Sequence, residues 1–293
     1  MSITPRKPYV VPLAGGRVLA LGDRPLVMGI LNVTPDSFAE SSSRVDPVAA
    51  VDVALQMEAE GADLLDVGGE SARPGAEPVS AEAELARVLP VVRGLAGRLH
   101  IPISVDTYKA EVARAAIDAG AALVNDISGL RYDPALASVA AERGAALVLM
   151  HMRGRPATMY AEAVYEDVIA EVAAELRASI ARATAGGVAV TAIIVDPGIG
   201  FAIRSAHSCG VLARLPQLAA ALDRPVLIGP SRKSFLSEAV GGRPAPQRDW
   251  GTVAAVTAAV LGGAHIVRVH AVAERAQAVR VAEEIRRHAA EDR

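Results

Sequence analysis

Three polar residues with complementary hydrogen-bonding groups each lie at or near the end of a short apolar run: Asp106, Asn125 and Asp196. A carboxylate can accept two parallel N–H bonds, and a side-chain amide both donates and accepts. If these side chains converge, they suit a flat heterocycle that presents an amidine-like edge of donors. Each residue by itself would more often orient a loop or cap a helix.

A second group of residues suits an anion such as a phosphate: Asn32, Arg73, Arg268 and His270. Arg268 and His270 are two residues apart, and in a strand this spacing points both side chains to the same face. The alternative is an ion pair for Arg268 and an imidazole of His270 that faces a helix.

Several other chemistries are excluded by the motifs that the chain lacks. No Cys and His residues have the spacing of zinc ligands, and neither G-x-S-x-G nor a phosphate-binding P-loop is present. A hard cation such as Mg²⁺ remains compatible, because it needs one protein oxygen besides the phosphates of a substrate. Asn32 is our candidate for that oxygen.

The elements that must position these residues follow a repeating pattern, in which a short apolar run precedes a longer segment of helical period. The predicted strands are Leu26–Val33, Leu64–Gly68, Ile101–Asp106, Leu123–Ile127, Ala146–Met150, Ala192–Asp196, Pro225–Gly229 and Ile266–His270. The predicted helices are Pro47–Glu60, Ala81–Leu99, Lys109–Ala119, Pro134–Glu142, Glu162–Ala183, His207–Leu222, Thr252–Leu261 and Val272–His288.

Eight strands that alternate with helices predict a parallel sheet closed into a (β/α)₈ TIM barrel, an α/β fold. An open doubly wound sheet is the alternative, but the first unit lacks a Gly-rich dinucleotide fingerprint, and polar residues end nearly every strand. Residues 9–21 predict a hairpin around Gly15 and Gly16. We therefore expect residues 1–25 to cap the amino-terminal end of a barrel formed by residues 26–293.

The composition indicates a packed, soluble globule. The 293 residues are 52% hydrophobic, and 30 Lys and Arg against 33 Asp and Glu give a net charge of −3, with few aromatic residues. Nucleic acid is therefore an unfavourable partner, and no segment has the length and apolarity of a membrane span. The single Cys209 and the absence of a signal peptide predict a cytoplasmic location.

Eight motifs, in chain order, resemble those of the dihydropteroate synthase family and span residues 26–285. They are residues 28–38 (MGILNVTPDSF), 66–75 (DVGGESARPG), 104–107 (SVDT), 124–126 (VND), 150–152 (MHM), 196–201 (DPGIGF), 231–234 (SRKS) and 268–270 (RVH). The resemblance implies an enzyme that joins 6-hydroxymethyl-7,8-dihydropterin pyrophosphate to p-aminobenzoate and releases pyrophosphate and 7,8-dihydropteroate.

The resemblance also implies roles for individual residues. The pterin ring would be held by Asp106, Asn125, Met150, Asp196 and Lys233, and the pyrophosphate with Mg²⁺ by Asn32, Arg268 and His270. The p-aminobenzoate side would comprise Phe38, Arg73, Pro74, Phe201, Ser231 and Lys233. The residues that carry catalysis would be Asp106, Asp196, Lys233, Arg268 and His270. A homodimer through the last helices is the expected assembly.

The implied reaction breaks the exocyclic C–O bond of the pterin first, because the electron-rich ring spreads the developing positive charge. Carboxylates stabilise that charge, while Mg²⁺, Arg268 and His270 neutralise the departing pyrophosphate. The aniline nitrogen then attacks a cation-like centre, so the reaction requires positioning and exclusion of water but no strong base.

The chain departs from the family pattern mainly on the p-aminobenzoate side. Ala39–Ser42 replaces a Ser-Asp-Gly-Gly segment, Ala72 replaces a Thr, and Ala202–Ile203 replaces Gly-Lys, with Arg204 as a candidate substitute for that Lys. Pro230 and Ala271 are further changes. Two alternatives stay open: a pterin-binding paralogue without condensation activity, and a pterin-binding methyltransfer module, which would need a corrinoid partner domain.

Overall fold

A computed structural model describes residues 6–34, 46–73 and 75–291. Eight parallel strands form one sheet in the order β8-β7-β6-β5-β4-β3-β10-β9. A parallel bridge between Val195 and Val226 joins its two edges and closes the barrel. The strands are β3 (Leu26–Asn32), β4 (Leu64–Gly68), β5 (Ile103–Asp106), β6 (Leu123–Asp126), β7 (Ala146–Met150), β8 (Ile193–Asp196), β9 (Leu227–Ile228) and β10 (Ile266–Val269). The predicted TIM barrel is confirmed.

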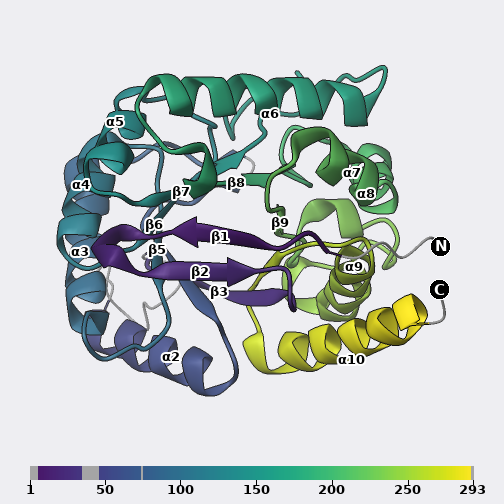
Figure 1. Cartoon of the computed structure of the whole chain (residues 1–293), viewed down its shortest axis with the longest axis horizontal. Helices are drawn as coiled ribbons and strands as arrows, with labels where there is room; N and C mark the ends of the chain where they lie inside the picture. Colours follow the sequence, from purple (N-terminus) through teal and green to yellow (C-terminus); the bar gives the residue numbers. More distant parts are fainter. Residues whose placement is uncertain (1–5, 35–45, 74, 292–293) are drawn as a thin grey trace.

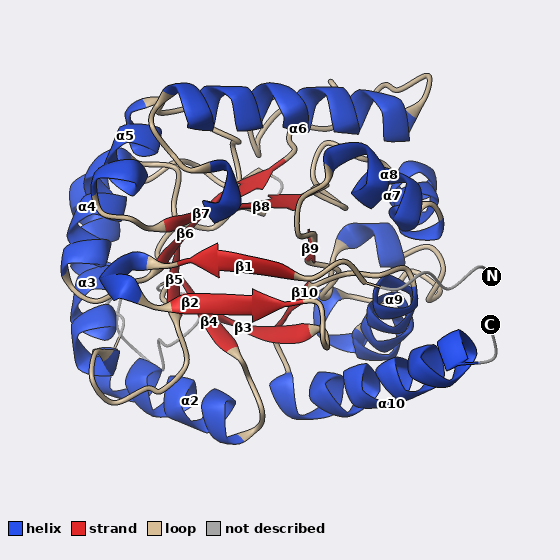
Figure 2. Ribbon diagram, in the orientation of Figure 1, coloured by secondary structure: helices blue, strands red, loops and turns tan. Residues whose placement is uncertain are grey.

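Helices surround the barrel on the outside (Figure 2). They are α2 (Pro47–Ala59), α3 (Ala81–Leu95), α4 (Ala110–Asp118), α5 (Ala135–Glu142), α6 (Val168–Ala185), α7 (Ser205–Ala213), α8 (Leu215–Leu222), α9 (Asp249–Leu261) and α10 (Val272–Glu291). Side-chain caps define where several begin. Asp46, for example, accepts a hydrogen bond from the Val48 amide at 2.9 Å, and Pro47 occupies the first helical position of α2.

Two predicted helices differ more from the observed ones than the others, whose ends shift by up to four residues. The segment predicted as Glu162–Ala183 becomes helical only at Val168, because Asp167 is the N-cap and accepts from the Ile169 amide at 3.0 Å. The segment predicted as His207–Leu222 is two helices that meet at Arg214. Pro216 has no amide hydrogen to continue the ladder of α7, so the chain starts a new helix there.

Side chains alternate between the two faces of each strand, and this alternation separates two layers of the core. Val27, Leu65 and Val105 belong to the large outer cluster, which packs the strands against the helices. Met28 and Leu64 belong to an inner cluster at the amino-terminal end of the barrel. Asp66, two positions after the inward Leu64, therefore faces the barrel interior. Asp106, next to the outward Val105, does so too.

The predicted hairpin forms strands β1 (Tyr9–Pro12) and β2 (Val18–Leu21), which pair antiparallel. It lies across one end of the barrel (Figure 1). Val11, Leu13 and Leu19 are buried in the same cluster as the inward side chains at the starts of the strands. The hairpin thus covers the end of the barrel opposite to the strands' carboxyl termini with apolar surface.

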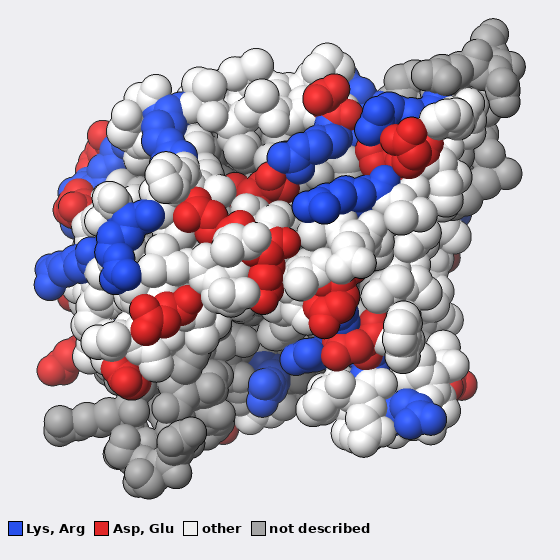
Figure 3. All heavy atoms as spheres, turned by 90° about the horizontal axis from the view of Figure 1, so that it is seen from below, with Lys and Arg blue, Asp and Glu red and all other residues white. Residues whose placement is uncertain are grey.

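Charges of both signs are interspersed over the face drawn in Figure 3, without a broad patch of one sign. This distribution offers no continuous basic track for a polyanion. Within the part of the chain that the structure describes, no helix combines the length and apolarity needed to traverse a bilayer.

The seam between β9 and β10 depends on a buried, neutral histidine. Nδ1 of His265 accepts a hydrogen bond from the Val226 amide at 3.1 Å, and Nε2 lies 3.0 Å from the carbonyl oxygen of Lys7. An imidazole that accepts at Nδ1 and donates at Nε2 must be uncharged. Burial accordingly lowers the pKa of His265 to about 4.

We predict that His265 makes the fold sensitive to acid. The unfolded chain binds a proton at this residue near pH 6.5, while the folded chain resists it down to about pH 4, so stability falls as the pH drops between these values. A shift of this size corresponds to about 3 kcal/mol. Denaturant unfolding at pH 7 and at pH 4.5 should show a smaller difference for His265→Asn than for the unsubstituted chain. Equal differences would contradict the assignment.

Candidate active site

A network of four polar side chains, Asp66 and Asn125 buried and Asp106 and Arg268 partly buried, lies inside the barrel near the carboxyl ends of its strands. Oδ2 of Asp66 accepts from Nδ2 of Asn125 at 2.8 Å and from Nε of Arg268 at 2.6 Å. Nη2 of Arg268 donates to Oδ2 of Asp106 at 2.6 Å. Arg268 therefore spans from β10 to β4 and β5, and it joins the two groups of residues that the sequence suggested as separate.

The buried setting shifts the pKa values of this network. Burial raises the pKa of Asp106, against the attraction of Arg268 and with the help of the Asp66 carboxylate. Burial works against the charge of Arg268 too, but Asp66 and Asp106 together hold its pKa above the ordinary value. The guanidinium thus stays charged between two carboxylates, and Asp106 holds its proton more tightly than an exposed carboxyl would.

Asp196 and Lys233 lie near enough at the mouth to act on each other's pKa. Oδ1 of Asp196 accepts from the Gly198 amide at 2.7 Å, and burial raises the pKa of this carboxyl while Lys233 opposes the shift. Nζ of Lys233 donates to the Ile199 carbonyl at 2.8 Å and lies 4.2 Å from the centre of the Phe201 ring. Burial lowers the pKa of Lys233 to about 8.

His270 directly follows β10, at the mouth of the barrel. Burial and the nearby Arg268, Arg232 and Arg73 lower its pKa to about 3. Oγ of Ser231 accepts from the His270 backbone amide at 3.3 Å and lies 2.9 Å from Nδ1. The contact with Ser231 holds the imidazole ring in place at the end of β10.

Asn32 ends β3, where it pairs in register with Gly68 of β4. Within residues 6–34, 46–73 and 75–291, no three His, Cys, Asp or Glu side chains gather in a way that could hold a metal ion. The described residues therefore fit only a cation that takes few protein ligands and keeps water or substrate oxygens. A side-chain amide oxygen such as that of Asn32 is a suitable ligand for Mg²⁺ under this condition.

The structure places the other predicted residues as follows. Met150 ends β7, pairs with Asp196 in register and is buried beside Met152 in a small cluster at the mouth, against which Phe201 packs. Arg73 is exposed on the loop after β4, close enough to act on the pKa of His270. Phe38, Pro74 and the departures at Ala39–Ser42 lie outside the described residues.

Four polar residues at the strand ends support the scaffold instead of facing the mouth. His151 bonds Glu175 of α6, Arg232 forms two hydrogen bonds with Asp249 of α9, and Asp126 accepts from the amides of Ser128 and Leu130. Glu70 accepts from Lys109. A position at the end of a strand thus places a residue near the mouth of the barrel. The alternation of side chains along the strand then decides whether that residue faces the interior.

Lys109 and two glutamates hold the loop that follows β4. Nζ of Lys109 contacts Oε2 of Glu70 and lies 2.5 Å from Oε2 of Glu84, which is almost fully buried on α3. Arg87 adds a hydrogen bond of 2.7 Å to the carbonyl of Gly69. These contacts fix the first residues of the loop that carries Arg73.

A pocket of about 470 Å³ is lined by Tyr160, Ile203, Arg204, Ser205, Ala206, Ser234, Phe235 and Glu238. The Tyr160 hydroxyl lies 2.8 Å from Oγ of Ser234 and donates to the Gly200 carbonyl at 3.2 Å. Nη2 of Arg204 donates to the carbonyl of Tyr160 at 3.1 Å. The side chain proposed as a substitute for the missing Lys therefore lines this pocket.

Asp66 is the residue that the sequence reasoning missed. It is fully buried and accepts from both Asn125 and Arg268, yet it was noted only as the start of a loop motif. The available signal was a carboxylate in the middle of the apolar strand LLDVG. An acidic residue in a buried strand requires a buried partner, and this requirement points to the barrel interior.

Comparison with known proteins identifies relatives of the whole barrel. Residues 28–270 match the model of the family described as pterin binding enzyme. A dihydropteroate synthase of Synechocystis sp. is 45% identical over 93% of this chain and 94% of its own length, and one of Mycobacterium leprae is 46% identical over 87% and 91%.

Solved structures agree with these relatives. The dihydropteroate synthase of Xanthomonas albilineans with 4-aminobenzoic acid has a TM-score of 0.87 and 43% identity, with 94% of this chain and 98% of that chain covered. The Burkholderia cenocepacia enzyme complexed with 7,8-dihydropteroate has a TM-score of 0.85 and 44% identity, with 97% and 100% covered.

We predict that Asp66→Asn lowers the free energy of unfolding by about 2 kcal/mol, because it removes one of two buried charged partners of Arg268. Denaturant unfolding at pH 7 measures the loss. Asp223→Asn is the matched control, since it removes the same charge from an exposed pair with Lys7, at a left-handed position that Asn tolerates. Equal losses in both variants would refute a special role for Asp66.

Proposed function

The chain belongs to the pterin-binding enzyme family, as a dihydropteroate synthase, and we propose that it performs this reaction with the side chains gathered at the mouth of its barrel. Dihydropteroate synthases are transferases of folate biosynthesis. The substrates are 6-hydroxymethyl-7,8-dihydropterin pyrophosphate and p-aminobenzoate. The observation that carries the proposal is the network of Asp66, Asp106, Asn125 and Arg268, with Asp196 and Lys233 beside it.

The pterin subsite comprises Asp106, Asn125, Met150, Asp196 and Lys233. The two carboxyl groups offer acceptors to the N–H groups of the ring, and the amide of Asn125 is oriented by its bond to Asp66. Met150 supplies an apolar surface against the ring. The bonds already made by these side chains hold them in place before the ring arrives, so little reorganisation accompanies binding.

In the proposed reaction the exocyclic C–O bond breaks first, and its electron pair leaves with the pyrophosphate. The positive charge that develops on the pterin is stabilised by the carboxyl groups of Asp106 and Asp196, which lie where water is excluded. The nitrogen of p-aminobenzoate then forms the C–N bond and loses one proton. Lys233, Asp106 and Asp196 thus stabilise charge and position the ring, and none is required as a nucleophile.

The pyrophosphate subsite comprises Asn32, Arg268 and His270. Arg268 contributes a positive charge, and His270 contributes a neutral imidazole, since burial lowers its pKa to about 3. Asn32 is the proposed ligand of Mg²⁺, which when bound supplies further positive charge to the leaving group.

The p-aminobenzoate side comprises Phe38, Arg73, Pro74, Phe201, Ser231 and Lys233. Support comes from the stacking of Lys233 on Phe201 and from the pocket of about 470 Å³. The loop of Arg73 is anchored through Glu70 by Lys109. Arg204 lines the same pocket, so a cationic side chain remains on the second-substrate side although the usual Lys is replaced by Ile203.

A homodimer is the proposed assembly. Val281 and Ile285 are 62% and 52% exposed and lie one turn apart on α10, and Trp250 at the start of α9 is 86% exposed. Large apolar side chains that share a helix face favour contact with a second copy. A cytoplasmic location is proposed from the composition alone.

We predict that purified protein releases pyrophosphate from the pterin substrate only when p-aminobenzoate and Mg²⁺ are both present. Asp196→Asn should lower the rate by at least a hundredfold, because one of the two carboxyl groups at the cation is lost. Asp223→Asn, at the surface, should retain the full rate.

Two other outcomes would change the assignment. Binding of the pterin without release of pyrophosphate in the unsubstituted protein would favour a pterin-binding paralogue that lacks condensation. Release that persists without Mg²⁺ would remove the proposed role of Asn32.

We predict a mass of about twice 30.2 kDa by light scattering at micromolar concentration. A double substitution, Val281→Glu with Ile285→Glu, should shift the protein to the monomer, because it places charges on the proposed interface. Val164→Glu, at an exposed valine outside α10, is the control and should leave the mass unchanged. A monomeric unsubstituted protein would refute the dimer.

A further inference from the structure

A second polar cavity lies outside the barrel, between the carboxyl end of β7 and helix α6. Its volume is about 90 Å³, and it is lined by Arg131, Met150, His151, Met152, Glu175, Ala178, Ser179 and Arg182. This volume is several times what a single water molecule needs, so a small polyatomic ligand has room. Neither the resemblance nor the proposed reaction uses this cavity or its two arginines.

The two arginines are held by the loop that follows β6, and each keeps donors to spare. Nη2 of Arg182 donates to the Gly129 carbonyl at 3.0 Å and to Oγ of Ser179 at 2.8 Å. Nε of Arg131 donates to the Ser128 carbonyl at 3.2 Å. Both arginines are exposed, and among the described residues neither guanidinium has a carboxylate within ion-pair distance, so several N–H groups remain without a protein acceptor.

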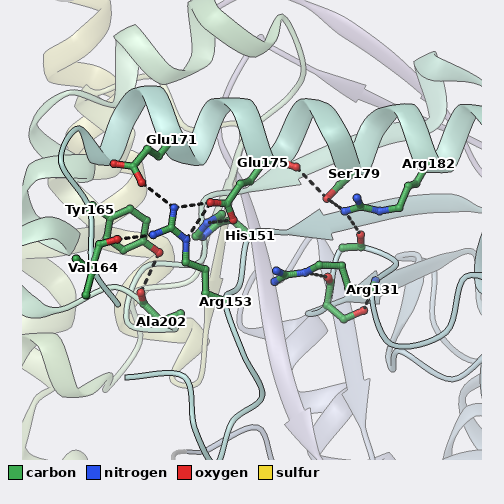
Figure 4. Close-up of polar contacts among 12 residues, drawn as sticks. Arg131, His151, Arg153, Val164, Tyr165, Glu171, Glu175, Ser179, Arg182 and Ala202 are labelled. Atoms are coloured by element: carbon green, nitrogen blue, oxygen red, sulfur yellow. Dashed lines mark hydrogen bonds and ion pairs between the residues drawn. The ribbon is translucent and has the colours of Figure 1, made fainter. Parts of the chain in front are cut away.

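The carboxylates nearby are already occupied. Oε2 of Glu175 contacts Nε2 of His151 at 3.1 Å, and Oε1 accepts from Nε of Arg153 at 2.9 Å (Figure 4). Arg153 also pairs with Glu171 at 2.8 Å. The two oxygens of Asp126 accept from backbone amides. The acidic groups around the cavity are therefore balanced by partners other than Arg131 and Arg182.

The two guanidinium groups also act on each other. Burial and the positive charge of Arg131 lower the pKa of Arg182, and only Asp126 opposes this shift. Like charges that are held close together by hydrogen bonds to one loop create a local positive potential, and an anion in the cavity would relieve it. Figure 4 shows Ser179 and Arg182 on the side of α6 that faces Arg131.

We propose that this cavity binds a small oxyanion of the size of inorganic phosphate, held by the free N–H groups of Arg131 and Arg182 and by the hydroxyl of Ser179. Two guanidinium groups present the flat sets of donors that match phosphate oxygens. The cavity accommodates one tetrahedral anion. The bound anion would lie behind Met150, at the outer edge of the pterin subsite.

The test separates this cavity from the anion subsite at the barrel mouth. Phosphate is titrated by calorimetry at constant ionic strength into protein that is already saturated with 6-hydroxymethyl-7,8-dihydropterin pyrophosphate, whose ring is too bulky for the cavity, in the absence of p-aminobenzoate. The unsubstituted protein should bind one further equivalent of phosphate per chain. Arg131→Gln with Arg182→Gln should weaken this binding at least tenfold, because both charged donors are removed.

A matched control removes two positive charges elsewhere. Arg177→Gln with Arg224→Gln alters two exposed arginines that also donate to backbone carbonyls, and it should leave phosphate binding unchanged. Thermal unfolding verifies that all variants are folded. No binding to the unsubstituted protein, equal binding to the Arg131 and Arg182 variant, or equal weakening in the control would each overturn the proposal. The comparison holds whether or not the mouth binds the pterin substrate.

Discussion

The pairing of Arg268 with Asp66 and Asp106 is the constraint on which the interior of the barrel depends. A guanidinium inside a barrel loses its hydration, and only well-placed carboxylates at 2.6 Å offset that loss. Asp66 comes from β4, Asp106 from β5 and Arg268 from β10. These strands are neighbours in the sheet through β3, which pairs with both β10 and β4. Arg268 reaches both carboxylates only if these strands adopt this order and register. The contacts of the site and the closure of the barrel therefore require each other.

The opposite end of the barrel shows the complementary solution. There the inward side chains are apolar, and the hairpin of β1 and β2 covers them with Val11, Leu13 and Leu19. Because water is excluded at this end, the polar groups at the mouth lie above a layer of buried apolar side chains. Low polarity beneath the mouth strengthens each electrostatic contact with a bound substrate. It also explains why burial is the leading cause of the shifted pKa values of Asp106, Asp196 and Lys233.

The sequence predicted the strands well because each is a short apolar run with a turn on either side, and no competing element has that pattern. It predicted the helices less well where one residue overrides the period, as Pro216 does between α7 and α8. Within the site it identified Asp106, Asn125 and Asp196, because strand ends are visible in one dimension. It missed Asp66, because the role of this residue depends on its contact with Arg268, which only the closed barrel defines.

Gly200 and Ala202, in the loop after β8, show why the fold accepts Ala at position 202, where the family has a glycine. Ala202 occupies the place of a family glycine and keeps a left-handed backbone with φ of 50°, which costs a non-glycine residue about 1 kcal/mol. Its carbonyl accepts from the Tyr165 hydroxyl at 2.9 Å, and this bond helps to hold the conformation. Gly200 has no such freedom, since a Cβ atom there would lie 2.9 Å from Cδ of Lys233. Substitution at position 202 strains only the backbone, so Ala is tolerated there. A side chain at position 200 would collide with Lys233, which passes this glycine to reach the pterin subsite.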